Sequence, residues 1–402
     1  MRLPSTIPCI ILLWLVSAPV LPLTAKAAGR CDSLPVEKRL HSPLSDTAFF
    51  PIAVWLQDPS LAPRYKKAGI NTYIGLWQGP TEAQLDILRE AGMKLICEQN
   101  AVGLRHLGDT LIIGWMHGDE PDNAQPLGKG KGYGPPVTPA EIFRRYRRLK
   151  AKDPSRPVLL NLGQGVAWDD WVGRGVRRNH PEDYPQYMQG GDIISFDIYP
   201  VAHPDTAISG KLWYVAKGVQ RLVKWGQGKK PVWNCLECTH IGEPDKKATP
   251  RQVRAEAWMS LIHGSTGLIW FVHEFRPAFN ASALLDDPQM LAAVTSVNRQ
   301  ITELAAVLHR PSLSDHAAAQ TAVPGMQVDM MAKQYGNSLY LFSVGMRKLG
   351  GSAAFHIKGL PQRTTVTVID EGRTLEARNG IFTDTFKPWD VHIYRIDYPG
   401  QR

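Results

Sequence analysis

The sequence predicts an α/β fold, a (β/α)8 TIM barrel followed by a small, sandwich-like all-β domain at the C-terminus. Three observations predict it. Between residues 49 and 310, short apolar runs alternate with helical stretches, which is the pattern of a parallel sheet built from βα units. Eight such runs occur, and eight parallel strands close a barrel. Beyond Arg310-Pro311 the pattern changes to alternating strands separated by glycine turns such as Asn379-Gly380.

Apolar runs rich in Val, Ile, Leu and aromatic residues mark the barrel strands. We expect these strands at Phe50–Gln57, Thr72–Trp77, Lys94–Gln99, Thr110–His117, Val158–Leu162, Ile193–Tyr199, Pro231–Glu237 and Gly267–His273. Helix starts support the alternation, because Thr81, Thr138 and Thr249 are each followed three residues later by glutamine or glutamate, the pattern of a capping box. A doubly wound open sheet is the alternative, but the sequence has no GxGxxG turn or phosphate loop.

The N-terminus has the pattern of a secretory signal. Arg2 precedes a mostly apolar stretch from Ile7 to Leu23, and Ala25 and Ala27 are the small residues that a signal peptidase reads. We therefore expect a cleavable signal peptide over residues 1–27, the barrel over 28–311 and the β domain over 312–402. Export of this kind leads to the periplasm or the outside of the cell.

Charge and composition exclude several classes of partner. The formal charge of +9 falls to +7 without Arg2 and Lys26, and its basic residues are spread along helices, as at 144–148, so we expect no nucleic-acid partner. No later stretch reaches the roughly 18 apolar residues that a membrane helix needs, so we expect no membrane insertion. We also expect no cofactor and no metal, and the sequence does not set the oligomeric state.

Ionisable side chains stand where several predicted strands end. Asp119 and Glu120 follow the fourth strand, Asp197 and Tyr199 end the sixth, and Glu237 ends the seventh. In a barrel these strand ends meet at one face, where active residues gather. Cleavage of a glycosidic bond needs one protonated carboxyl and a second, ionised carboxyl across the sugar ring. Glu120 and Glu237 fit those two tasks, so the sequence predicts a glycoside hydrolase.

The order of these residues resembles the large clan of retaining (β/α)8 glycoside hydrolases, and its β-galactosidase-like members in particular. The resemblance covers about 260 residues. It implies that Glu120 is the acid/base and Glu237 the nucleophile. It also implies that Tyr199 contacts the nucleophile and that Trp270, in the predicted eighth strand, lies beneath the sugar.

The chain departs from that clan in one place, because the residue before Glu120 is Asp119 rather than asparagine. This favours a second interpretation, a substrate-assisted N-acetylhexosaminidase in which Asp119 orients the substrate's acetamido group, Glu120 is the acid and Glu237 only binds. Two other classes remain as alternatives. One is a non-catalytic carbohydrate-binding barrel, and the other is a metal-dependent hydrolase with ligands among residues 117–122.

The expected substrate is an oligo- or polysaccharide. Aromatic rings at strand ends stack on the apolar faces of sugars, and Trp55 and Trp77 have that position. Polar side chains at or near the strand ends are expected to contact sugar hydroxyls, namely Glu98, Asn161, Asp197, His240 and Glu274.

The leader generates a prediction that needs no structure. Signal peptidase should cut after Ala27, because Ala25 and Ala27 supply the small residues of its site. N-terminal sequencing of protein recovered outside the cytoplasm should therefore begin at Ala28. A sequence that begins at Met1 would contradict this assignment.

Overall fold

A computed structural model of the chain describes residues 43–397. The expected signal peptide and its cleavage site lie outside these residues. Within the described part, none of the helices has the length and apolar character that crossing a membrane requires.

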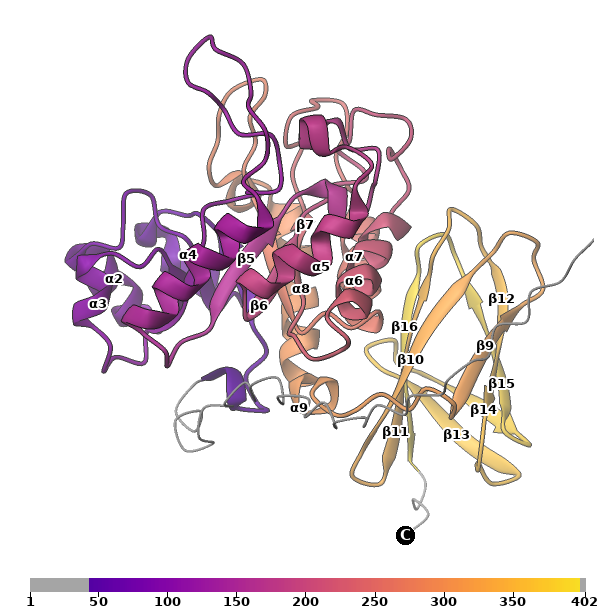
Figure 1. The fold of residues 1–402 in the computed structure, drawn as a ribbon. Coiled ribbons are helices and arrows are strands. Elements are labelled where there is room, and N and C mark those ends of the chain that lie inside the picture. Colours follow the sequence, from indigo (N-terminus) through magenta and orange to yellow (C-terminus); the bar gives the residue numbers. More distant parts are fainter. Residues whose placement is uncertain (1–42, 398–402) are drawn as a thin grey trace, which may run out of the picture. The chain divides into compact units, whose positions relative to one another are not determined.

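Eight parallel strands form the first sheet, as the sequence predicts (Figure 1). Their hydrogen-bonded order is β6-β5-β4-β3-β2-β1-β8-β7. Parallel bridges from Ile194 to Val232 and from Asp197 to Cys235 join β6 to β7, so the sheet closes on itself. The strands are β1 Ile52–Trp55, β2 Thr72–Ile74, β3 Lys94–Cys97, β4 Ile112–Met116, β5 Val158–Leu162, β6 Ile193–Phe196, β7 Trp233–Glu237 and β8 Gly267–Phe271.

Helices follow most of these strands, and their starts have the predicted caps. Thr81 and Thr249 form complete capping boxes with the glutamine three residues on. Thr138 caps its helix through the Glu141 N–H, but the Glu141 carboxylate instead bonds to arginines on the same helix. The helices are α1 Ala62–Lys67, α2 Glu82–Glu90, α3 Ala101–Arg105, α4 Pro139–Lys152, α5 Tyr184–Tyr187, α6 Trp213–Trp225, α7 Pro250–Ile262, α8 Pro288–Glu303 and α9 Ala305–Leu308, with short 3₁₀ helices at Pro43–Ser45, Pro59–Leu61, Gln164–Val166, Val172–Arg177, Pro181–Asp183, Met188–Gly190 and Ala283–Asp286.

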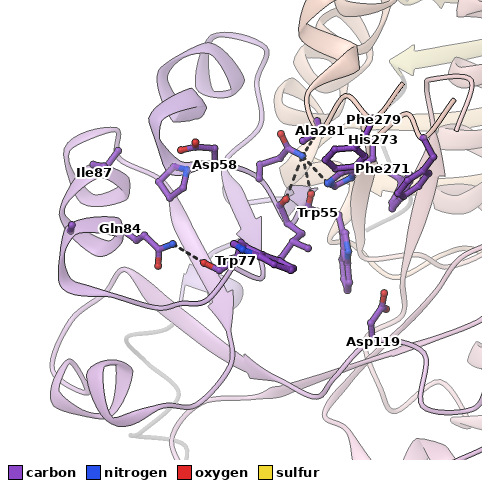
Figure 2. Close-up of a pocket in the computed structure, with 15 residues that line it drawn as sticks. Trp55, Asp58, Trp77, Gln84, Ile87, Asp119, Phe271, His273, Phe279 and Ala281 are labelled. Carbon is purple, nitrogen blue, oxygen red and sulfur yellow. Dashed lines mark hydrogen bonds between the residues drawn. The ribbon is translucent and has the colours of Figure 1, made fainter. Parts of the chain in front are cut away.

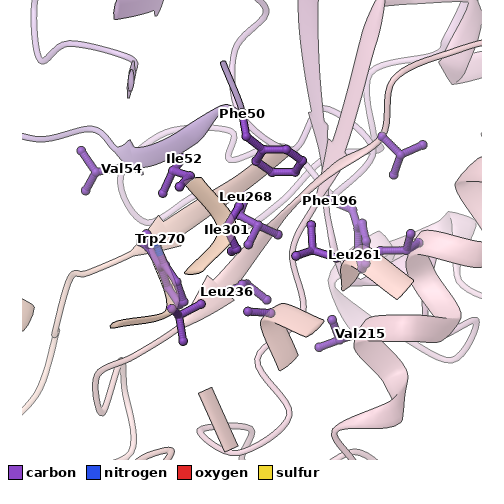
Figure 3. Close-up of a cluster of buried hydrophobic side chains, with 14 of the residues drawn as sticks. Phe50, Ile52, Val54, Phe196, Val215, Leu236, Leu261, Leu268, Trp270 and Ile301 are labelled. Carbon is purple, nitrogen blue, oxygen red and sulfur yellow. The ribbon is translucent and has the colours of Figure 1, made fainter. Parts of the chain in front are cut away.

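Alternation along each strand divides the apolar side chains between two layers. In β8, Ile269 packs inside the barrel, whereas Leu268 and Trp270 pack between the sheet and its helices. Figure 3 shows Leu268 and Trp270 in this outer layer together with Ile301 of α8. Because the interior is filled by side chains, polar groups become available only at the strand ends.

The second sheet is antiparallel throughout, in the order β10-β11-β16-β13-β14-β15-β12-β9. The predicted turn Asn379-Gly380 joins β14 to β15 with positive φ angles of 50° and 80°, which suits a tight hairpin turn. The strands are β9 Ala317–Thr321, β10 Val328–Tyr335, β11 Ser338–Gly345, β12 Gly351–Ile357, β13 Arg363–Val368, β14 Arg373–Arg378, β15 Ile381–Phe386 and β16 Val391–Asp397.

Helix α7 connects the two sheets. Its residues are buried without interruption from Ala255 to Ile262, so both of its sides are covered. Trp258 stacks on Phe342 of β11 with ring centroids 5.3 Å apart. Arg254 donates a hydrogen bond to the Val391 carbonyl at 2.7 Å. The β domain therefore covers an apolar helix face that the barrel by itself would leave in water.

This packing predicts the effect of truncation. Protein that ends at Arg310 keeps all eight barrel strands but exposes the Trp258 face of α7, and burial of one large aromatic side chain contributes about 2–3 kcal/mol. We expect the truncated protein to have a lower Tm than the full chain and to aggregate. Thermal unfolding monitored by circular dichroism, with light scattering, measures both effects. A Tm equal to that of the full chain would show that the two units are energetically independent.

Candidate active site

Strained backbone marks the face of the barrel where the strands end. Leu56, Gln78, Glu120 and Ile241 follow β1, β2, β4 and β7, and they have positive φ angles of 44°, 53°, 39° and 55°. Side chains other than glycine rarely adopt this region, and a β-branched residue such as isoleucine is especially disfavoured there. Such strain collects at functional sites because the surrounding structure holds it in place.

Two carboxyl groups from different strands meet at this face. Glu120 lies in the loop after β4, Asp197 follows β6, and their side chains share a hydrogen bond. One of the two must carry a proton for that bond to form. Both side chains are partly exposed, so water reaches the recess between the strand ends in which they lie. Tyr199 adds a hydroxyl, which donates to Asp197 Oδ2 at 3.4 Å.

Burial and negative neighbours raise the pKa of both carboxyls. Burial raises the pKa of Glu120 to about 7, and the charge of Asp119 adds to the effect. The pKa of Asp197 is raised well above its usual range, first by burial and then by Glu120. Because burial and mutual repulsion disfavour ionisation of both groups, the two carboxyls share one proton.

Asp119 is oriented by a chain of polar side chains that crosses two strands. Ser195 of β6 donates to Asn161 Oδ1 at 2.7 Å, and Asn161 of β5 donates to Asp119 Oδ1 at 2.8 Å. Burial raises the pKa of Asp119 even though solvent reaches its side chain, because the surrounding protein restricts its hydration. In the described part of the chain, no group of three or more His, Cys, Asp or Glu side chains is arranged to hold a metal ion.

Residues in the loops after β4 and β5 hold the Glu120 side chain in place. Trp171 donates to Asn123 Oδ1 at 3.0 Å, and Asn123 donates to Glu120 Oε2 at 2.9 Å. Gly163, just after β5, allows this approach, since a Cβ there would lie 2.9 Å from Glu120 Oε1 and 2.8 Å from the Asn123 amide. Any larger residue at this position would displace the carboxylate.

A buried aspartate, Asp122, holds the loop after β4 that carries Glu120. Asp122 accepts hydrogen bonds from the Gly163 N–H at 2.9 Å and from the Tyr184 hydroxyl at 3.1 Å. Arg174 donates to the Asp122 carbonyl at 3.2 Å and pairs with Asp183 at 2.8 Å. This network supports the positive-φ backbone at Glu120.

Glu237, the expected second catalytic carboxylate, does not lie in this recess. Its side chain is fully buried, and its two oxygens accept hydrogen bonds from the Val201 N–H at 2.6 Å and the Ala202 N–H at 2.7 Å. It also shares a hydrogen bond with Glu256 of α7, which is equally buried. Glu237 therefore lies between the turn after β6 and helix α7, away from solvent, whereas Glu120 and Asp197 are partly exposed.

This geometry gives Glu237 a different role from the expected one. Its carboxylate holds the backbone of the turn that follows Asp197 and Tyr199, and thereby positions those two side chains. Burial raises the pKa of Glu237 to about 7, and it raises the pKa of Glu256 well above its usual range. Sequence reasoning placed Glu237 at the strand end correctly, but it could not show that the turn after β6 would cover the carboxylate.

A pocket of about 780 Å³ adjoins the carboxyl cluster, which consists of Asp119, Glu120 and Asp197. The pocket is lined mainly by aromatic and aliphatic side chains (Figure 2). Phe271, His273 and Phe279 gather on one side of it, and Trp77 lies toward helix α2. Asp119 belongs both to this pocket and to the cluster. Its lining residues are Trp55, Leu56, Gln57, Asp58, Pro59, Trp77, Ala83, Gln84, Ile87, Asp119, Phe271, His273, Phe275, Phe279 and Ala281.

Several other predicted contacts lie elsewhere. The structure contradicts the expected position of Trp270, which is fully buried outside the barrel and donates to Asn298 of α8 at 2.9 Å. Alternation along β8 explains the error, because Phe271 rather than Trp270 has the inward parity. Glu98 lines a separate pocket beside α4. His240 and Glu274 do not line the aromatic pocket.

Sequence reasoning missed the two phenylalanines of the loop after β8. Phe275 and Phe279 are 51% and 65% exposed, and each stacks on His273 with ring centroids 6.3 and 6.2 Å apart. A bridge between Glu274 and Asn280 closes the loop that carries them. Two aromatic residues close together in a loop after a barrel strand were the available signal, since clustered exposed apolar side chains mark interaction sites.

The Glu237 and Glu256 pair generates a prediction about stability and pH. A carboxyl whose pKa is raised by folding holds its proton longer in the folded state, so the free energy of unfolding falls as pH rises from about 4.5 through about 7. Glu256→Gln keeps a donor for Glu237 but cannot ionise. The free energy of unfolding of this variant should therefore fall less steeply as pH rises. Its slope should be smaller than that of wild type by about 1.4 kcal/mol per pH unit, the value for one proton.

Urea unfolding of wild type and Glu256→Gln between pH 5 and 8 measures this difference in slope. Glu141→Gln, on the solvent side of α4, is the matched control and should keep the wild-type slope. Parallel curves for wild type and Glu256→Gln would mean that the two buried glutamates share no proton.

Solved structures share this fold at low sequence identity. A candidate α-galactosidase from Bacteroides fragilis has a TM-score of 0.51 at 10% identity, over 88% of this chain and 80% of that chain. A second candidate, an α-galactosidase/melibiase of the same organism, has a TM-score of 0.51 at 10% identity, over 87% and 80%. The α-amylase of Geobacillus thermoleovorans, solved with acarbose, has a TM-score of 0.50 at 10% identity, over 87% and 98%. No family model and no curated protein matches the sequence. The comparisons establish the (β/α)8 barrel with its C-terminal β domain.

Proposed function

We propose that the protein is a glycoside hydrolase whose catalytic carboxyls are Glu120 and Asp197. The observation that carries the proposal is the hydrogen bond between these two carboxyls, both with raised pKa, at the strand-end face of the barrel. Glycoside hydrolysis needs one carboxyl protonated and one ionised near the same bond, and this pair provides both forms near neutral pH. The α-galactosidase and α-amylase folds named above agree with the proposal.

A non-catalytic carbohydrate-binding barrel is less well supported. Placing two carboxyls side by side in a poorly hydrated recess is costly, and a binding site for neutral sugars gains nothing from it. The positive φ of 39° at Glu120 is a further local cost of the arrangement. Costs of this kind are typical of catalytic centres.

The hydrogen bonds around the pair support definite roles for the two groups. Glu120 accepts from the Asn123 amide, which favours its ionised form, so Asp197 is the general acid that protonates the leaving oxygen. Glu120, which Asn123 keeps in place, is the carboxylate that attacks the anomeric carbon. Carboxyls in direct contact are nearer the roughly 5–5.5 Å separation of a retaining pair than the roughly 6.5–9.5 Å that an intervening water needs, which favours a retaining reaction. This assignment reverses the role that the sequence suggests for Glu120 and replaces Glu237 by Asp197.

Substrate-assisted hydrolysis of N-acetylhexosaminides is the second candidate. Asp119 favours it, because this carboxylate lines the pocket and Asn161 fixes one of its oxygens. An orienting carboxylate next to a proton donor would serve an acetamido nucleophile. Under this alternative Asp119→Asn is the crippling change, and only N-acetylated substrates are cleaved.

Export is also part of the proposal. The leader over residues 1–27 directs the enzyme out of the cytoplasm, where it would meet glycosides of the surroundings.

Azide rescue distinguishes these mechanisms through the configuration of the product. After a screen of 4-nitrophenyl glycosides, including N-acetylhexosaminides, identifies a substrate, Glu120→Gly should lose at least about 10³-fold in kcat. Azide should then occupy the space of the missing nucleophile and form a glycosyl azide of inverted configuration. With Asp197→Gly, azide should intercept the glycosyl-enzyme and form the azide of retained configuration.

Glu237→Gly and Glu98→Gly serve as controls, with folding checked by circular dichroism. Neither should give an azide product, and Glu98→Gly should keep wild-type turnover. An inverted azide from Glu237→Gly would assign the nucleophile to Glu237 and contradict the proposed pair. A retained azide from Glu120→Gly would restore Glu120 as the acid/base.

A further inference from the structure

The pocket beside the carboxyl cluster is lined mainly by apolar side chains. Ten of its fifteen lining residues are apolar or aromatic. Trp77, Phe275 and Phe279 are 72%, 51% and 65% exposed, so their rings are presented to whatever enters. At about 780 Å³ the pocket is within the usual size range for small-molecule sites, roughly 300–1,000 Å³.

The amide groups that line the pocket are already bonded within the protein. Gln57 donates to the Ala281 carbonyl at 2.6 Å and accepts from the Tyr65 hydroxyl at 2.7 Å. Gln84 accepts from the Thr81 N–H at 3.0 Å and donates to the Trp77 carbonyl at 3.0 Å. The Gln57 amide also contacts His273 Nε2 at 3.3 Å.

Only the two aspartates of the lining keep an oxygen for a ligand. Asp58 uses Oδ1 to accept from the Ser60 N–H at 2.9 Å, and Asp119 uses Oδ1 to accept from Asn161 at 2.8 Å. Their remaining oxygens are acceptors, and both side chains are exposed. Apart from these oxygens and the engaged amides, the polar side-chain atoms of the lining are the indole N–H groups of Trp55 and Trp77 and the buried Nδ1 of His273, which are few for the hydroxyls around a sugar ring.

The cost of removing water from a ligand determines which chemical groups this pocket can bind. A sugar placed between these rings would give up water from several hydroxyls and find few partners for them, which is costly. A flat apolar group loses no hydrogen bonds there and stacks on the exposed rings. Because Asp119 borders both the pocket and the carboxyl cluster, a group bound in the pocket lies next to the proposed bond-cleaving pair.

We propose that this pocket binds an apolar, aromatic aglycone, so that the substrates are glycosides of hydrophobic alcohols or phenols rather than chains of sugars. This inference rests on the proposed glycosidase function and specifies the class of substrate. The sugar itself then occupies the recess of Glu120, Asp197 and Tyr199, and the aglycone lies between Trp77 and the two phenylalanines. Trp77 is thus assigned to the aglycone and not to a sugar.

A binding experiment tests this without any need for turnover. 2-Naphthol, as a free aglycone, is titrated into the full-length protein by isothermal calorimetry, with maltotriose, cellotriose and xylotriose as hydroxylated probes. We expect 2-naphthol to bind and the trisaccharides to bind at least about 10-fold more weakly. Trp77→Ala and Phe279→Ala should each raise the Kd for 2-naphthol by about 3- to 10-fold.

Tyr133→Ala is the matched control, because Tyr133 is 75% exposed but does not line the pocket, and it should leave the Kd unchanged. Tighter binding of any trisaccharide than of 2-naphthol would overturn the aglycone assignment while leaving the glycosidase proposal intact. Equal losses in Tyr133→Ala and Trp77→Ala would reveal non-specific binding and also overturn it. Binding of 2-naphthol that depends on Trp77, in a protein that cleaves no glycoside, would support the apolar pocket and contradict the glycosidase function.

Discussion

Closure of the parallel sheet is the constraint on which the rest of this structure depends. The bridge from Asp197 to Cys235 joins β6 to β7 and completes the ring of eight strands. Closure brings strand ends that are far apart in sequence to one face, and it fills the interior with apolar side chains. Glu120 and Asp197 therefore meet in a recess where water is scarce, and scarce water raises their pKa and keeps one shared proton between them.

The chain contains two carboxyl pairs of similar chemistry in different surroundings. Glu120 and Asp197 are partly exposed and adjoin a pocket, so their proton is available to a ligand. Glu237 and Glu256 are fully buried, and the backbone N–H groups of Val201 and Ala202 satisfy Glu237. The first pair is suited to catalysis, and the second links α7 to the turn after β6. Access to solvent, rather than the carboxyl chemistry, separates their roles.

Hydrogen-bond satisfaction also explains the character of the aromatic pocket. Gln57 and Gln84 look like sugar-binding residues when only their positions at strand ends and helix starts are considered. Gln57 instead ties β1 to the loop after β8, and Gln84 completes the cap of α2. Because these amides are engaged, a ligand in the pocket mainly contacts aromatic rings. We therefore expect the apolar part of the substrate to determine which substrates bind.

Local patterns in the sequence determined the eight barrel strands, the capped starts of α2 and α7 and the alternating strands after residue 317, because each depends on neighbours within a few residues. They also placed Asp119, Glu120, Asp197 and Glu237 at strand ends. Only the tertiary structure decided which of these carboxyls meet. That outcome depends on the direction of the side chain at each strand end, as the outward direction of Trp270 illustrates. It also depends on loops far along the chain, such as the turn at 201–202 that covers Glu237. Burial, and with it the pKa of each carboxyl, arises from contacts between segments that the sequence separates.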